Sequence, residues 1–356
     1  MTGFQEPDAL LVLLPGRGEG QSVVFCQDRD PHLEAWTGRR LGAQGVVSQH
    51  GLDQAFENAE RDARLPSLLE GRELLYAPLD NPDALGIAKE ALAQAQSGMR
   101  RGKPPLKGWL DSRPLIHEMR LIKSPAEIAL LRHAAAISAQ AHVRAMRTCQ
   151  AGVYEYQLQA ELEHTFVWHG ASGPAYSTIV GGGANACVLH YIENSDVLEE
   201  NTLVLIDAGA EFDLYAGDIT RTFPVGGRFN DAQRELYHVV LGAQERAVKA
   251  IAPGATLADI HQGVVEDLTA GLIEVGLLTG GGASSHRRRE LSALLPSLHV
   301  SLVRTGCARR RYLSPRRNHA TPAGTGHGAD RRTRSLHSLR RRYSRSLSRY
   351  RHSYRG

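Results

Sequence analysis

The stretch Leu203–Arg228, LVLIDAGAEFDLYAGDITRTFPVGGR, predicts two antiparallel strands joined by a short polar turn. Four apolar residues open the first strand, and Asp207 follows them at its expected end. A second carboxylate, Asp218, lies beyond the turn. Two desolvated like charges on one face of a strand pair repel each other unless a cation neutralises them. The pattern therefore predicts a divalent metal site, and a plain hairpin with aspartates in turn or capping positions is the alternative.

The charge of the chain is divided very unevenly. Residues 281–356 hold 19 of the 42 basic residues, all of them arginine, and only two of the 38 acidic residues. That leaves 23 basic and 36 acidic residues in 1–280, so the net charge is +17 for the tail and −13 for the remainder. An acidic globular protein followed by a strongly basic tail is expected, and each part needs its own explanation.

The length and composition are those of a globular protein. A chain of 356 residues suggests about two domains. No apolar run is long enough to span a bilayer, and no basic-then-apolar signal peptide is visible. The four cysteines lie far apart, which argues against a zinc ribbon or a disulfide framework. These features predict a reducing, cytoplasmic setting.

The N-terminal part predicts a small α/β domain up to about residue 115. Strands are expected at 9–14 and 22–26, with a Gly-rich turn between them. Two strands alone are marginally stable, so either later strands complete the sheet, with Leu74–Ala77 as one candidate, or the N-terminus has been lost.

A second unit begins at Ser124-Pro125-Ala126-Glu127, a capping box with proline at the first helical position. A buried stripe is expected on this helix, and its apolar residues are Leu130, Ala134, Ile137, Ala141 and Ala145. A second helix is expected from the spacing of Leu158, Leu162 and Phe166. Asn230 is expected to cap a third, with apolar residues at Leu236, Val240, Ala243 and Ala247, and Thr256 to cap a fourth. Helices before and after antiparallel strands predict an α+β domain whose helices cover one face of a sheet.

Strands are also expected at Tyr176–Val180 and at Cys187–Tyr191, with a bend at the three glycines between them. Those glycines do not have the spacing of a phosphate-binding loop. His190 would then lie on a strand among apolar neighbours, where a lone histidine is more often a hydrogen-bonded core residue than a catalytic one.

Several segments together resemble aminopeptidase P, the Xaa-Pro aminopeptidase of the pita-bread metallopeptidases. They are ACVLHYIEN (186–194), LIDAGAEFDLYAGDITRTFPVGG (205–227), the helix beginning KSPAEIALLRHAAAISAQ (123–140) and the N-terminal TGFQEPDALLVLLPG (2–16). The resemblance covers nearly all of 1–278. It implies a partial pita-bread, creatinase-like α+β catalytic domain at 116–280 and a truncated α/β N-terminal domain at 1–115. The composition of 281–356 predicts a disordered basic tail after them.

The resemblance also assigns roles to three residues. Asp207 is similar to the first metal-ligating aspartate, Asp218 to the aspartate that bridges two metal ions, and His190 to a catalytic histidine that lines the substrate site. It implies two divalent ions, usually Mn²⁺, which activate a water for attack on the bond before a penultimate proline. The implied substrates are peptides with proline second, and relatives commonly form homo-oligomers.

The remaining family ligands, one His and two Glu, belong where the basic tail lies, and no PGM…EPG or HDVG motif occurs there. The tail is open to three interpretations: a nucleic-acid-binding arm, a solvated segment with little to bury, or the normal gene translated in a shifted frame. We favour the third, so no nucleic-acid partner is expected.

The shifted-frame hypothesis can be examined by reassigning permitted codons. Residues 294–312, 323–338 and 349–356 can then yield, in family order, His-Asp-Val-Gly, Val-Glu-Pro-Gly and Arg-Ile-Glu, which contain the missing His and both Glu. We place the shift near residues 278–282. The nucleotides at that point, or a mass spectrum of the tail, would decide the matter.

The expected family function is metal-dependent release of the N-terminal residue from peptides with proline second. Because only two of five ligands are present, we expect little or no activity from this chain itself. Two alternatives are a prolidase-like Xaa-Pro dipeptidase and a non-catalytic protein whose basic tail binds nucleic acid.

Overall fold

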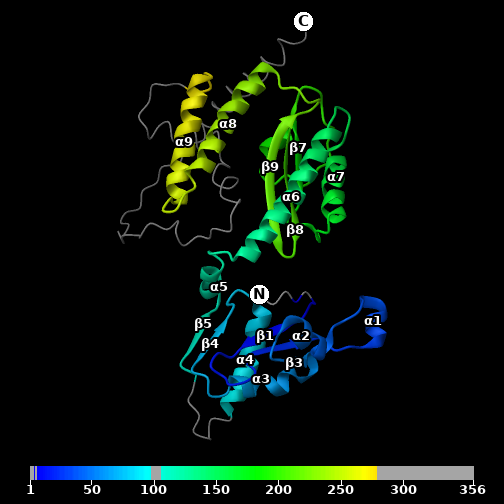
Figure 1. Ribbon diagram of the computed structural model, residues 1–356, viewed down its shortest axis with the longest axis vertical. Coiled ribbons are helices and arrows are strands. Elements are labelled where there is room, and N and C mark those ends of the chain that lie inside the picture. Colours follow the sequence, from blue (N-terminus) through cyan, green and yellow to red (C-terminus); the bar gives the residue numbers. More distant parts are fainter. Residues whose placement is uncertain (1–3, 5, 98–105, 279–356) are drawn as a thin grey trace, which may run out of the picture. The chain divides into compact units, whose positions relative to one another are not determined.

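The computed structural model describes residues 4, 6–97 and 106–278 (Figure 1). The predictions about the tail, both the disordered segment and the shifted frame, lie outside these residues. Helices and strands are mixed throughout the described part, which confirms the α+β class. No helix in this part of the chain is long and apolar enough to cross a membrane.

The N-terminal residues form a three-stranded sheet in the order β1-β2-β3. The strands are β1 (Leu10–Leu13), β2 (Ser22–Cys26) and β3 (Gln54–Glu57). β1 pairs with β2 antiparallel, whereas β2 and β3 are parallel. The helices here are α1 (Pro31–Thr37), α2 (Gly42–His50), α3 (Arg61–Leu69) and α4 (Pro82–Ser97), with a 3-10 turn η1 (Asn58–Glu60).

A later strand does complete the first sheet, but it is β3 and not Leu74–Ala77, which forms a strand in a different sheet. β4 (Leu74–Ala77) instead pairs in parallel with β5 (Gly108–Asp111), and α5 (Arg113–Met119) follows. β3 is short and has polar ends, so its sequence gave little strand signal. Its Phe56 ring packs against Phe25 of β2, with the ring centres 5.9 Å apart, so a tertiary contact holds it in the sheet.

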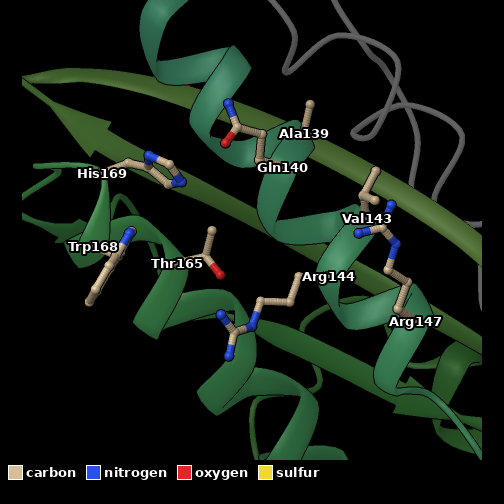
Figure 2. A pocket seen from close by; sticks show the side chains of 8 residues that line it. All are labelled: Ala139, Gln140, Val143, Arg144, Arg147, Thr165, Trp168 and His169. Carbon is tan, nitrogen blue, oxygen red and sulfur yellow. The ribbon is translucent and has the colours of Figure 1, made fainter.

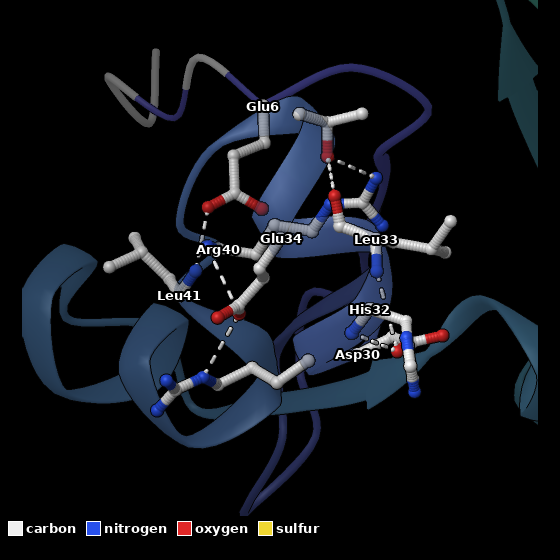
Figure 3. A network of polar contacts seen from close by, with 9 residues as sticks. Glu6, Asp30, His32, Leu33, Glu34, Arg40 and Leu41 are labelled. Carbon is white, nitrogen blue, oxygen red and sulfur yellow. Dashed lines mark hydrogen bonds and ion pairs between the residues drawn. The ribbon is translucent and has the colours of Figure 1, made fainter.

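Carboxylates satisfy free backbone N–H groups around α1 and α2 (Figure 3). Asp30 caps α1 by accepting from His32 N at 2.8 Å. Glu34 accepts from Arg29 Nε at 3.2 Å and from Arg40 N at 3.3 Å, and the Arg29 bond is the main reason its pKa lies below the usual value. These acidic groups order the backbone, and they are not gathered into a site.

The capping box at Ser124 and Glu127 forms as predicted and begins α6 (Pro125–Thr148). The stripe expected on this helix is buried at four of its five positions: Ala134, Ile137, Ala141 and Ala145. α7 (Glu155–Trp168) follows, and its predicted core residues Leu158, Leu162 and Phe166 are fully buried.

The central sheet is built on β8 (Leu203–Phe212). β6 (Gly173–Pro174), β7 (Ile179–Gly182) and β9 (Tyr215–Pro224) all pair with β8 in antiparallel fashion. The predicted hairpin is therefore present, and its two-residue turn places Asp213 and Leu214 at positive φ. α6 and α7 lie along this sheet (Figure 1), and a shared apolar core joins them to β7, β8 and β9.

Two further helices pack against each other: α8 (Asp231–Ala250) and α9 (Leu257–Glu274). Their caps at Asn230 and Thr256 form as predicted. The stripe expected on α8 is buried at Ala243 and Ala247, whereas Leu236 and Val240 are 39% and 51% exposed. The hairpin of helices has its own small core, which includes Val264 and Leu268 of α9.

Candidate metal centre

The strand register brings the two predicted aspartates together. Asp207 lies opposite Thr220, and Asp218 lies opposite Gly209, so the two carboxylates are diagonal neighbours on one face of the β8–β9 pair. Asp207 is not at the end of its strand, as the sequence suggested, but in the middle of β8. Its exposed fraction is 9%, so the protein must compensate for removing this charge from water.

Tyr176 lies between the two carboxylates. Its hydroxyl oxygen is 2.7 Å from Oδ1 of Asp207 and 3.0 Å from Oδ1 of Asp218. Burial raises the pKa of this phenol well above its usual range, and the hydrogen bond to Asp207 and the two negative charges act in the same direction. The phenol therefore stays protonated, and its O–H group donates a hydrogen bond to the carboxylate pair.

No sequence pattern singled out Tyr176. It is 31 residues from one aspartate and 42 from the other, and it lies in a predicted strand that in fact begins three residues later. Pairing of Ile179 with Asp207 brings the end of this segment beside β8. The only available signal was an aromatic residue with a hydroxyl group at the start of a predicted strand, which is too common to be useful.

Two glycines allow the backbone to pack tightly around the carboxylates. A Cβ atom on Gly209 would lie 2.5 Å from the carbonyl oxygen of Gly217 across the strand pair. A Cβ atom on Gly217 would overlap the backbone carbonyl of Ala134 on α6. The small residues flanking the two aspartates are therefore needed for the close approach of β8, β9 and α6.

Two buried polar side chains of α6 hold β8 from behind. The Ser138 hydroxyl donates to Ala134 O and accepts from Ala210 N, both at 2.9 Å. Nε2 of His142 lies 3.2 Å from Ala208 O, so this nitrogen carries the proton. Burial lowers the pKa of His142, so the ring is neutral at physiological pH.

The donor set for a metal ion is partial among the described residues. In that part of the chain, no group of three or more His, Cys, Asp or Glu side chains is placed to hold an ion. Asp207 and Asp218 have the hard oxygen atoms that a divalent cation such as Mg²⁺ or Mn²⁺ prefers, but two residues do not complete its coordination. The prediction that one His and two Glu are missing concerns residues 281–356, outside the described part.

His190 does not lie on a strand, so the predicted strand at 187–191 was wrong. A 3-10 helix, η3 (Gly183–Cys187), leads into a turn, and His190 is exposed in that turn. Val188 and Leu189 beside it are 54% and 44% exposed, so the apolar pattern does not mark a buried strand. The buried residue of the segment is Tyr191, at 8% exposure.

A cavity of about 530 Å³ lies between the outer faces of α6 and α7 (Figure 2). Its lining includes Arg144, Arg147 and Trp168 and contains no carboxylate. The α6 residues that line the cavity and the α6 residues that are buried against the sheet lie on opposite faces of the helix. The cavity is therefore on the side of α6 that faces away from β8. It is separate from the Asp207–Asp218 pair.

Family models match most of the chain. The model described as metallopeptidase family M24 matches residues 129–349, and the model described as aminopeptidase P, N-terminal domain, matches residues 1–76.

Curated proteins with similar sequences agree with these matches. The chain is 44% identical over 281 residues to the Xaa-Pro aminopeptidase of Escherichia coli, covering 78% of this chain and 64% of that protein. It is 41% identical over 280 residues to the Xaa-Pro aminopeptidase of Haemophilus influenzae, covering 79% and 63%. The chain thus spans less than two thirds of the length of these relatives.

Solved structures resemble the fold closely. An aminopeptidase of Pseudomonas aeruginosa superposes with a TM-score of 0.79 at 44% identity, covering 82% of this chain and 66% of that one. A variant of Escherichia coli aminopeptidase P in complex with substrate gives a TM-score of 0.78 at 42% identity, covering 83% and 67%.

Proposed function

This chain belongs to metallopeptidase family M24, and we propose that its function is metal-dependent release of the N-terminal residue from peptides with proline in second position. The predicted resemblance to aminopeptidase P and the predicted partial pita-bread fold are both confirmed. The observation that carries the proposal is the convergence of Asp207 and Asp218 on the Tyr176 hydroxyl. The names of the relatives supply the substrate class.

In this proposal each residue has a defined task. Asp207 and Asp218 would hold the divalent ions, the role that the resemblance gives to both residues. When bound, such ions lower the pKa of a water and polarise the scissile carbonyl. Tyr176 keeps the carboxylates in one orientation, and Gly209 and Gly217 let the strands come close enough for both to face the same point. His190 lines the substrate site.

The domain boundaries belong to the proposal as well. We assign residues 1–115 to an aminopeptidase P N-terminal domain, 116–280 to the N-terminal part of the catalytic domain and 281–356 to the Arg-rich tail. We further propose Mn²⁺ as the metal, because hard carboxylate ligands suit it. A cytoplasmic setting is supported by the wide spacing of the cysteines.

Metal binding provides the first test. Titration of the full chain with Mn²⁺, followed by paramagnetic broadening of NMR signals, is expected to affect the β8–β9 hairpin. Asp207→Asn and Asp218→Asn should each weaken this effect at least tenfold. Asp213→Asn is a matched control, since this residue lies in the turn of the same hairpin and asparagine tolerates its φ of 46°. Equal broadening in all three variants would contradict the proposed metal site.

Peptide hydrolysis provides the second test. We expect the 356-residue chain to cleave an Xaa-Pro tripeptide slowly or not at all, since two carboxylates leave the ions incompletely coordinated. A series of Xaa-Pro peptides of increasing length, with and without Mn²⁺, distinguishes an aminopeptidase from a dipeptidase. Rapid Mn²⁺-dependent cleavage by purified protein of this sequence would refute the expected loss of activity.

A further inference from the structure

Glu155 is a charged residue at a place where a lone charge would be very unfavourable. It is the first residue of α7, and its exposed fraction is 0%. A buried carboxylate is tolerated when charge-assisted hydrogen bonds replace the water it has lost. The identities of the groups that supply those bonds therefore show what the carboxylate holds in place.

Each carboxylate oxygen of Glu155 accepts two hydrogen bonds. Oε1 accepts from Gly182 N at 2.7 Å and from Asn185 Nδ2 at 3.1 Å. Oε2 accepts from Tyr191 Oη at 2.7 Å and from Asp196 N at 3.0 Å. The carboxylate is thus fully satisfied, and all four donors come from the segment 182–196.

These donors are spread over the whole segment. Gly182 N stands at its beginning and Asp196 N at its end, while Asn185 and Tyr191 lie between them. The backbone N–H of Glu155 also donates to Asp196 O at 2.9 Å. One side chain of α7 therefore closes a loop that contains the 3-10 helix η3 and otherwise irregular backbone. His190 immediately precedes Tyr191, one of the residues that anchor the loop.

Side chains within the loop reinforce this arrangement. Asn185 Nδ2 lies 3.0 Å from Tyr191 Oη and 2.9 Å from Asp196 Oδ2, so the anchors contact one another as well as Glu155. Gly182 is closely packed, because a Cβ atom there would lie 2.6 Å from Leu198 Cδ2 and the buried Leu198 side chain would have to shift. The loop is fixed by specific contacts, although it has no regular strand pairing.

A second buried side chain fixes the end of the loop to β7. Asn194 is 1% exposed and has a φ of 48°. Its Oδ1 accepts from Val180 N at 2.9 Å, and its Nδ2 donates to Thr178 O and to Gln159 Oε1, both at 2.8 Å. The backbone near the end of the loop is thereby tied to the strand that borders β8.

We propose that Glu155 is a positioning residue, whose buried carboxylate holds the loop 183–196 in one conformation and so fixes where His190 is presented. The proposal relies on the proposed function only for the role of His190. The structural part stands on the four hydrogen bonds and can be tested without any enzymatic activity.

Glu155→Gln is the direct test, because it preserves size and replaces one acceptor oxygen by an NH₂ donor. Each oxygen faces a backbone N–H, so the amide must set a donor against a donor. We expect amide hydrogen exchange in 183–196 to accelerate at least tenfold, while amides of the β8–β9 hairpin keep wild-type rates. Glu161→Gln is the control, since Glu161 lies on the same helix and pairs with exposed Arg144. It should leave both regions unchanged.

A spectroscopic signature of His190 separates positioning from general stability. The imidazole resonances of His190, assigned with His190→Gln, should move toward those of an unstructured histidine in Glu155→Gln. The resonances of His142, buried elsewhere against β8, should stay in place. Unchanged His190 signals and unchanged exchange in a folded Glu155→Gln protein would overturn the proposal.

Tyr191→Phe serves as a second variant if Glu155→Gln does not fold. It removes one of the four hydrogen bonds and keeps the buried ring. Faster exchange confined to 183–196 supports the proposal, and wild-type exchange there overturns it. Because neither residue contributes to the Asp207–Asp218 pair, Mn²⁺ broadening of the hairpin should persist in both variants. A failed metal titration would therefore leave the proposal for Glu155 intact. Unchanged amide exchange in 183–196 would likewise leave the proposed metal site intact.

Discussion

Tyr176 and Asp207, which are 31 residues apart in sequence, are joined by a 2.7 Å hydrogen bond, and the same hydroxyl lies 3.0 Å from Asp218. One phenol proton thus serves two carboxylates that would otherwise repel each other in a poorly solvated place. A divalent cation would relieve the same repulsion. The geometry of the candidate metal centre therefore depends on a neutral residue as well as on its two charged ones.

Tyr176→Phe should destabilise the protein, because it keeps the ring and removes the shared proton. We expect the free energy of unfolding in urea to fall by about 1.5–3 kcal/mol, the range for a hydrogen bond to a charged group. Tyr215→Phe is a matched control on β9, since its hydroxyl makes a single hydrogen bond, 2.9 Å long, to Glu127. An equal or larger loss in Tyr215→Phe would contradict the special role of Tyr176.

Gly209→Ala should be far more disruptive than an ordinary glycine substitution. The new methyl would press against the backbone of Gly217 and Asp218, which cannot move as a flexible side chain can. We expect a loss of about 3 kcal/mol or more, measured by thermal or urea unfolding. Gly263→Ala on α9 is the control: nothing lies within 4 Å of its added Cβ atom, so it should stabilise the protein by about 0.5–1 kcal/mol. A similar change in the free energy of unfolding for the two variants would show that β8 and β9 pack less tightly than the structure indicates.

The neutral, buried His142 should make the protein less stable in mild acid. Its folded pKa is lowered below the ordinary value of 6.5, mainly by burial. Below that pH the unfolded chain binds a proton that the folded chain does not. The contribution of His142 to the free energy of unfolding is therefore fully present above pH 6.5. It is lost as the pH falls toward the folded pKa, by up to about 1.4 kcal/mol per pH unit.

His142→Gln isolates this effect, because glutamine can still donate to Ala208 O and does not titrate. Urea unfolding between pH 7.5 and 5.5 should show a smaller acid-induced loss in the variant than in the wild type. His164→Gln removes an exposed histidine and should retain the wild-type slope. Identical slopes in all three proteins would show that His142 does not contribute.

The features that local sequence determines were predicted correctly. The hairpin of β8 and β9 follows from apolar runs on either side of a short polar segment, and the start of α6 follows from the capping box of Ser124 and Glu127. Both depend on residues close together in sequence. Alternation along the two strands also sufficed to place Asp207 and Asp218 on one face.

The features that depend on distant contacts were missed. The apolar residues at 187–191 suggested a strand, but hydrogen bonds to Glu155, more than 30 residues away, and the anchoring of Asn194 to β7 produce a loop instead. Tyr176 was overlooked for the same reason, since its role exists only after β7 has paired with β8. Local periodicity has no access to these long-range polar contacts.

The cysteines provide a chemical test of burial in both halves of the described chain. Burial raises the pKa of the Cys149 thiol to about 11 and also raises that of Cys26, whereas Cys187 is exposed beside the His190 turn. Only a thiolate reacts with iodoacetamide, and at pH 8 about one Cys149 thiol in a thousand is ionised. Native protein should therefore be alkylated at Cys187 and protected at Cys26 and Cys149, as read by peptide mass spectrometry. Urea should abolish the difference. If native Cys149 reacts as fast as Cys187, the packing of α6 against the sheet is not as tight as the structure indicates.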